Sequence, residues 1–174
     1  MNDLDTIAAI CTAIAIGQGG IAIIRVSGPD ARKIGASILG KPKNQIFESH
    51  KVMYGHVIDK LNKSLIDEVL VLFMKAPKSF TGEDVLEIHC HGGLIAVQRV
   101  LELILSFPNT RRAEAGEFSQ RAVLNGKMNV TKAESINDLI AARSHKAAQL
   151  AMAGIDGGIQ RQMNNLRNEL LDHL

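Results

Sequence analysis

The residues with the most chemical potential lie in one segment, FTGEDVLEIHCHGG, at residues 80–93. Alternate side chains of a β-strand point to opposite faces. A strand here would bury its apolar side chains on one face and carry titratable side chains on the other. The titratable residues are Glu87, His89 and His91. Because this row runs into a Gly-Gly helix start, it predicts a polar pocket.

Two other interpretations of this row remain open. Two imidazoles and a carboxylate can ligate zinc or iron, but a third or fourth ligand at metal-motif spacing is missing. The row can also be an ordinary solvated strand face.

Two cations stand out because of their surroundings. Arg25 lies near the end of the apolar run GIAIIRV, where it needs a partner, either in an ordinary ion pair or in a ligand. Lys127 follows Asn125 and Gly126, which are expected to end a helix. A cation at a helix C-terminus suits the helix dipole whatever its function, so the surroundings alone leave both roles open.

Two glycine-rich stretches invite comparison with phosphate-binding loops. The segment GASILGKP at residues 35–42 has the spacing GxxxxGK, but Pro42 stands where a P-loop supplies a hydroxyl to magnesium. Helix formation and capping explain it better. The stretch GQGG at residues 17–20 allows a close approach of backbone to a ligand, and equally forms a tight turn.

Strand and helix patterns alternate along the first two thirds of the chain. Apolar β-rich runs indicate strands, and apolar residues at helical spacing indicate helices. The continuous apolar run at residues 68–74 is typical of a buried strand. The expected elements are strands at 7–16 and 21–27, a helix near 31–38, strands at 51–59, 68–74 and 85–91, and a helix from 93 to about 106.

From residue 117 onward the pattern is helical, and we expect a boundary near residue 118. Thr131 and Glu134 form a TxxE capping box ahead of a long helical pattern, which glycines at 154–158 interrupt. A last apolar stripe consists of Ile159, Met163, Leu166 and Leu170. The fold class is therefore α+β, with a mixed sheet and helices in residues 1–118 and an all-α segment in residues 119–174. The unfinished stripe predicts that the sequence is cut from a longer helical domain.

Composition narrows the class of protein. Of the 174 residues, 46% are hydrophobic and 22% charged, which excludes disorder and allows a core. A net charge of +2 and only six aromatic residues, five Phe and one Tyr, argue against broad RNA-binding surfaces. Cys11 and Cys90 are expected to be small buried hydrophobes in a reducing cytoplasm. The run at residues 7–16 is too short to span a membrane.

Several long motifs, in order, resemble the N-terminal part of the MnmE (TrmE) family of tRNA-modification GTPases. They are DTIAAI, GGIAIIRVSGP, SFTGEDVLEIHCHGG, AGEFSQRAVLNGKMNVTKAESINDLIAA and AGIDGGIQRQMNNLR. The chain departs from the family in its first loop, where TAIAIGQGG replaces TPPGRGG and Gln18 replaces the arginine.

The resemblance implies a fold, a cofactor and partners. The first domain would resemble the tetrahydrofolate-binding domain of the glycine-cleavage T-protein, form a homodimer and bind 5-formyltetrahydrofolate or a related reduced folate. The family's folate-contacting residues match Arg25, Glu87 and Lys127. Catalytic residues and metal ligands are not expected in this part of the family.

The resemblance also implies a larger reaction, because the family's helical domain is split by a GTPase domain that uses GTP, Mg²⁺ and K⁺. With an FAD-dependent MnmG partner, the family adds an aminomethyl-type group to C5 of the wobble uridine of certain tRNAs. That GTPase domain would begin beyond residue 174, so this chain alone is expected neither to hydrolyse GTP nor to complete the modification. The expected location is the cytoplasm, without membrane attachment.

Two other functions remain in view. One is a stand-alone aminomethyltransferase-like folate enzyme with its own catalytic group on the face of Glu87, His89 and His91. Its weakness is chain length, because such an enzyme needs further domains to enclose a substrate. The other is a helical oligomerisation scaffold without a ligand.

Overall fold

The computed structural model describes residues 5–13, 19–39, 47–59, 63–158 and 166–171. The chain divides into two compact units, residues 1–118 and residues 119–174. The first unit contains the sheet with two helices, and the second is helical. This arrangement confirms the α+β class with an all-α segment after it.

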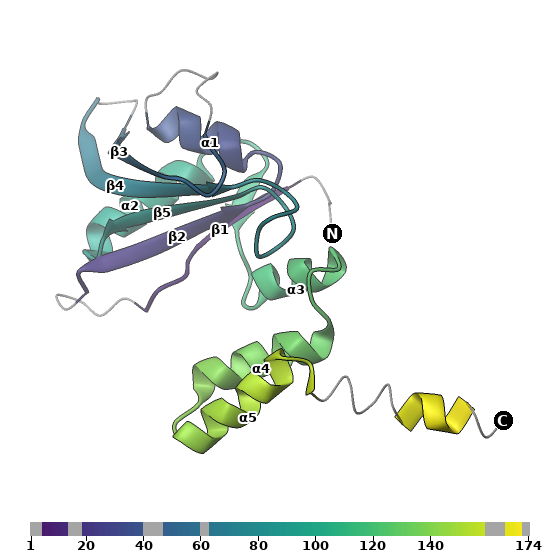
Figure 1. Ribbon diagram of the computed structural model, residues 1–174. Coiled ribbons are helices and arrows are strands. Elements are labelled where there is room, and N and C mark those ends of the chain that lie inside the picture. The colour runs from purple at the N-terminus through teal and green to yellow at the C-terminus, as the bar shows by residue number, and fades with distance from the viewer. Residues whose placement is uncertain (1–4, 14–18, 40–46, 60–62, 159–165, 172–174) are drawn as a thin grey trace. The chain divides into compact units, whose positions relative to one another are not determined.

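The first unit is built on a six-stranded mixed sheet with strand order β3-β4-β5-β2-β1-β6 (Figure 1). Its neighbouring strands are antiparallel except for β1 and β6, which are parallel. The strands are β1 (Thr6–Ile10), β2 (Ile21–Ser27), β3 (Val52–Ile58), β4 (Leu65–Met74), β5 (Val85–His91) and β6 (Thr110–Arg112). Only β6 lacks an expected counterpart, because three residues are too few to show a pattern.

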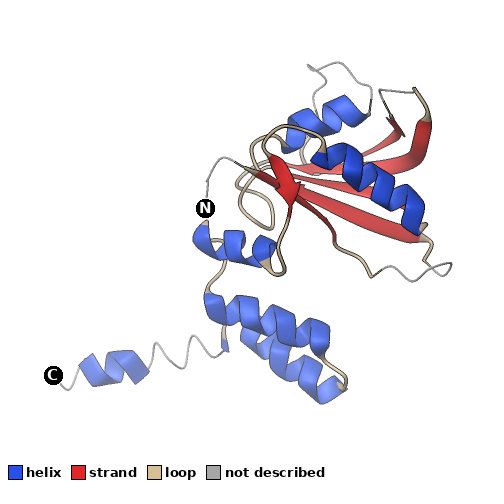
Figure 2. Ribbon diagram, turned by 180° about the vertical axis from the view of Figure 1, so that it is seen from behind, coloured by secondary structure: helices blue, strands red, loops and turns tan. Residues whose placement is uncertain are grey.

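Two helices cover one face of this sheet, as the view from behind shows (Figure 2). They are α1 (Ala31–Ile38) and α2 (Leu94–Leu105), both close to their expected bounds. Gly35 lies inside α1 and faces the Leu86 side chain, so the GxxxxGK spacing begins in a packed helix. The core between helices and sheet includes Leu86, Ile88 and Cys90 of β5, each at most 2% exposed. The expected two-faced pattern of β5 is confirmed.

The opposite face of the sheet stays accessible in the described part of the unit. Leu70 of β4 is 47% exposed and Glu68 is also exposed, whereas Val69 and Val71 between them are buried. The expectation that β4 is buried on both faces is therefore wrong. Such strands belong to parallel sheets, whereas an antiparallel sheet can pack one face and leave the other to water or a ligand.

The second unit contains α4 (Val130–Ala141) and α5 (His145–Ile155). The boundary between the two units falls within α3 (Glu117–Leu124). The expected capping box is wrong, since the Asn129 side chain caps α4 by accepting the Lys132 N–H at 2.8 Å. Residues 166–171 are also helical, but Ile159 and Met163 of the expected stripe lie outside the described residues. Among the described residues, no helix combines the length and hydropathy that crossing a bilayer requires.

Candidate functional site

The open face of the sheet carries an ion pair between neighbouring strands. Arg25 of β2 lies directly opposite Glu87 of β5 in the antiparallel register. The Arg25 Nε and Nη2 atoms both donate to Glu87 Oε1, at 2.9 and 2.7 Å. The two side chains are only 24% and 14% exposed. The structure thus brings together two of the three residues to which the family resemblance assigned folate contacts.

Aromatic rings flank the Arg25 guanidinium. Its central carbon lies 5.1 Å from the ring centroid of Phe80 and 5.6 Å from that of Phe118. Both distances are within the range of cation–π attraction. Phe80 comes from the segment before β5 and Phe118 from the first turn of α3. Sequence reasoning missed both residues as part of the site, although each stands inside a motif that it had quoted.

A buried polar network fixes the segment that carries Phe80. Ser27 Oγ lies 2.7 Å from Thr81 Oγ1 and donates to Glu83 Oε2 at 2.7 Å. Ser27 and Thr81 are fully buried. Ser27 is the last residue of β2, so this network ties the Phe80 segment to the strand that holds Arg25.

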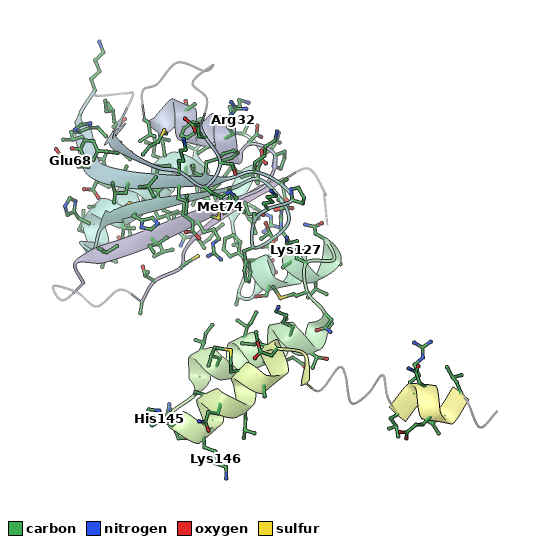
Figure 3. The ribbon with its side chains drawn as sticks, in the orientation of Figure 1. Arg32, Glu68, Met74, Lys127, His145 and Lys146 are labelled. Atoms are coloured by element: carbon green, nitrogen blue, oxygen red, sulfur yellow. The ribbon has the colours of Figure 1, made fainter. Side chains whose placement is uncertain are left out.

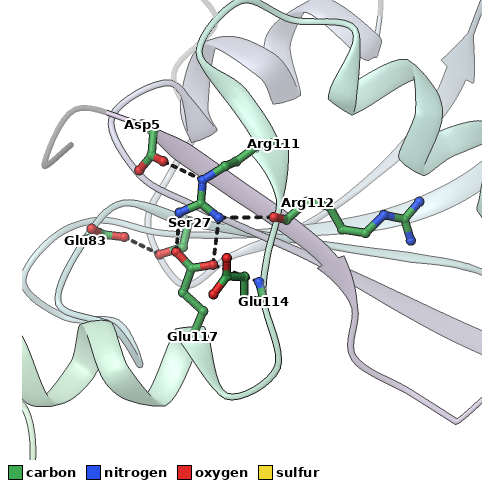
Figure 4. A network of polar contacts seen from close by, with 7 residues as sticks. All are labelled: Asp5, Ser27, Glu83, Arg111, Arg112, Glu114 and Glu117. Carbon is green, nitrogen blue, oxygen red and sulfur yellow. Dashed lines mark hydrogen bonds and ion pairs between the residues drawn. The ribbon is translucent and has the colours of Figure 1, made fainter. Parts of the chain in front are cut away.

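A second network fixes the start of α3 (Figure 4). Arg111 of β6 donates to both carboxylate oxygens of Glu117, at 2.8 and 2.5 Å, and its Nε donates to Asp5 Oδ2 at 2.7 Å. Glu117 also accepts the Glu114 N–H, and its side chain is fully buried. Hydrogen bonding to Glu117 is the main cause of a raised pKa of Arg111, which keeps the guanidinium charged. The network therefore holds the residue next to Phe118.

His89 lies two residues beyond Glu87 along β5. It is on the same face of the strand and lies opposite Ile23 of β2. Its Nε2 atom is buried, finds no hydrogen-bond partner in the part of the chain that the structure describes, and lies 3.8 Å from Glu87 Oε2. That distance is too long for a hydrogen bond. His89 thus borders the ion pair without completing its own polar contacts.

His91 is the exposed member of the row and has a different partner. Its Nδ1 lies 2.6 Å from Oδ1 of Asp67, and its backbone N–H donates to Asp67 Oδ2 at 2.9 Å. Hydrogen bonding to Asp67, which is only 8% exposed, raises the pKa of His91. The expected row is therefore divided, with His89 beside Glu87 and His91 held by Asp67, a residue that sequence reasoning missed. The described residues contain no cluster of metal-ligating side chains.

The two cysteines differ, and the expectation that both are buried is wrong for Cys11. Cys90 is buried in the core, which raises its pKa to about 12. Cys11 is exposed, because it lies just beyond the end of β1, where its N–H still bonds to the Ile23 carbonyl. Partial desolvation is the main cause of a raised pKa at Cys11. The Arg25 charge lowers the pKa of Cys11 and the Glu87 charge raises it, and both effects are smaller than that of desolvation.

Lys127 belongs to the second unit, directly after α3 (Figure 3). Its N–H donates to the carbonyl of Ala122 at 2.8 Å, and Gly126 before it has a φ of +69°. A positive φ at this place is typical of a glycine that ends a helix. The expected helix end is confirmed, and the role of the Lys127 side chain in ligand binding stays a prediction.

A cavity of about 890 Å³ lies elsewhere, between α4 and α5. Its lining includes Ala141, Leu150 and Gly154 and none of the residues assigned to ligand binding. The Arg25–Glu87 pair has the convergent polar and aromatic groups that binding sites use, so we take it as the candidate site.

Comparison with known families decides what kind of protein this is. Residues 6–127 match the family described as the GTP-binding protein TrmE N-terminus. The chain belongs to this family. The matched range includes Arg25, Phe80, Glu87, Phe118 and Lys127.

Curated relatives agree with the family match. A tRNA modification GTPase MnmE from Prochlorococcus marinus (strain MIT 9303) is 63% identical over 169 residues, which are 97% of this chain and 36% of the relative. The MnmE of Parasynechococcus marenigrum (strain WH8102) is 61% identical over all 174 residues, or 38% of its length. The MnmE of Synechococcus sp. (strain CC9902) is 57% identical over 174 residues, or 39% of its length. This TrmE N-terminal chain thus spans well under half of the relatives it matches.

Proposed function

We propose that the first unit binds a reduced folate, such as 5-formyltetrahydrofolate, on the open face of its sheet. One observation supports this most: the mostly buried Glu87 carboxylate is paired with Arg25, and two aromatic rings flank the guanidinium. The face of this sheet is accessible to a ligand, since its apolar side chains at Leu70 and Ile21 are exposed.

The residues fit the chemistry of a reduced folate. A carboxylate accepts hydrogen bonds from the amino and ring N–H groups of a pterin. The Nε2 atom of His89 is buried and has no hydrogen-bond partner among the described residues, so one polar group of the site is left for a ligand. The guanidinium of Arg25 and the ammonium of Lys127 suit ring carbonyls or the anionic glutamate tail. The folate itself would carry the one-carbon unit.

Isothermal titration with 5-formyltetrahydrofolate tests the proposal. Glu87→Ala should weaken binding more than about tenfold, because each stranded pterin donor costs about 1–3 kcal/mol. Glu102→Ala is the matched control, since Glu102 is an exposed carboxylate on α2, which covers the opposite face. Equal affinity of the Glu87 variant and the wild type would remove Glu87 from the site.

We also propose that the chain is the folate-binding region of a whole protein that modifies tRNA. The matched relatives are named tRNA modification GTPases. In that protein, an FAD-dependent MnmG partner and a GTPase domain using GTP, Mg²⁺ and K⁺ would act with this region on the wobble uridine. Filter binding of labelled GTP to the present chain should give only background, since residues 35–42 lack the hydroxyl of a P-loop.

A homodimer through the first unit is part of the same proposal. Exposed apolar side chains of the β3–β4 hairpin, such as Val52 and Leu65, supply surface that association could bury without covering the Arg25–Glu87 pair. The competing interface is the last helix, where Leu166 and Leu170 are 58% and 61% exposed. Light scattering should still report a dimer for Leu166→Glu/Leu170→Glu. A monomeric double variant would show that the dimer forms through that helix instead.

A further inference from the structure

His89 Nε2 is the one buried side-chain polar atom without a hydrogen-bond partner among the described residues. Buried polar groups in proteins are almost always hydrogen-bonded, and an exception calls for an explanation such as a missing ligand. The atom sits on the sheet face that carries Arg25 and Glu87, since position 89 follows position 87 at the strand period of two. The unsatisfied atom is therefore next to the proposed folate site.

The geometry beside Glu87 narrows what the missing partner can be. Arg25 uses Oε1 of Glu87, and Oε2 lies 3.8 Å from His89 Nε2. One nitrogen can lie at hydrogen-bonding distance from both atoms, because 3.8 Å is well below twice the usual donor–acceptor distance of about 2.9 Å. A nitrogen with two hydrogens can donate one to each.

We propose that Oε2 of Glu87 and Nε2 of His89 together bind an exocyclic amino group of the ligand's heterocycle. His89 acts here as a binding residue, with its proton on Nδ1 and the lone pair of Nε2 directed at the ligand. Flat rings with such a group match the aromatic side chains of Phe80 and Phe118 nearby. This inference rests on the proposed folate site and assigns it a specificity for amino-substituted rings.

The competing arrangement needs no ligand at His89. A protonated imidazole would donate from Nε2 to Oε2 of Glu87 and close the 3.8 Å gap. In that case His89 would only orient the carboxylate, and the ligand's amino group would bind elsewhere. The two arrangements differ in the protonation of Nε2 and in their dependence on the amino group.

The test is isothermal titration of the full chain with 5-formyltetrahydrofolate and with its 2-desamino-2-methyl analogue. We expect His89→Leu to weaken binding of the parent folate about tenfold and to leave binding of the analogue unchanged. His89→Gln should restore part of the affinity, because its terminal amide reaches the position of Nε2, whereas the shorter His89→Asn should not. His56→Leu is the matched control, because His56 is an exposed histidine of β3 that lies beside Glu68.

A measurement on the wild type keeps the test independent of variant folding. The ¹⁵N spectrum of His89 should show an unprotonated Nε2 whose shift changes when the parent folate binds and changes less with the analogue. An Nε2 that is protonated in the bound state, or equal losses for both ligands in His89→Leu, would overturn the inference while Glu87→Ala still reports the folate site. Absence of any wild-type binding would instead refute the proposed function, and the inference with it.

Discussion

Glu117 anchors the first turn of α3, and its replacement by glutamine should destabilise the first unit. The carboxylate is fully buried and accepts two hydrogen bonds from the guanidinium of Arg111. Each charge-assisted hydrogen bond contributes about 1.5–3 kcal/mol, which gives an upper bound of about 3–6 kcal/mol. Arg111 is 38% exposed, so water replaces part of the loss. We expect Glu117→Gln to lower the free energy of unfolding by about 2–4 kcal/mol.

Urea unfolding followed by tyrosine fluorescence measures this loss, because Tyr54 is the only tyrosine, the chain has no tryptophan, and Tyr54 lies in β3 of the same unit. Glu114→Gln is the matched control, since it removes the same charge from an exposed residue of the same segment. It should change the free energy of unfolding by less than about 0.5 kcal/mol. Equal stabilities of the two variants would refute the argument that the buried network holds α3. A selective loss in Glu117→Gln should also weaken folate binding, because Phe118 follows Glu117.

Three further results follow from the first unit. His91 should titrate above 6.5 in an NMR titration and fall back in Asp67→Asn. The raised pKa means that this pair stabilises the fold fully below about pH 6.5 and loses its effect as the pH rises through that pKa. Iodoacetamide should alkylate Cys11 faster as the pH rises, and more slowly when folate is bound. It should not alkylate Cys90 until the protein unfolds. Gly92→Ala should lower the melting temperature and cost about 1–3 kcal/mol, because its Cβ would lie 2.1 Å from a backbone oxygen of the loop before β2.

The sequence predicted the elements whose local pattern is strong. The alternation over residues 85–91 placed Glu87 and His89 on one face and the core residues on the other, because side chains in a strand have a period of two. The helices at 31–38 and near 94–105 were also predicted from helical spacing. Local pattern, however, does not give pairing between distant segments.

The missing parts of the site depend on that pairing. Arg25 and Glu87 are 62 residues apart, and only the β2–β5 register brings them together. Two separate polar networks hold the segments that place Phe80 and Phe118 beside the Arg25 guanidinium. The hydrogen-bond partner of His91 is Asp67, which lies on the neighbouring strand. The capping error concerns which residue begins the helix. Asn129 is the N-cap of α4 and accepts the Lys132 N–H, so Thr131 lies inside the first turn of the helix and not at the capping position.

A crystal structure of the chain with bound 5-formyltetrahydrofolate tests the site most directly. The pteridine ring should lie on the open sheet face, with its N–H groups at hydrogen-bonding distance from the Glu87 carboxylate and its ring near Phe80 and Phe118. Density for the ring at another place, or its absence from this face at a concentration that saturates binding in solution, would contradict the proposed folate site.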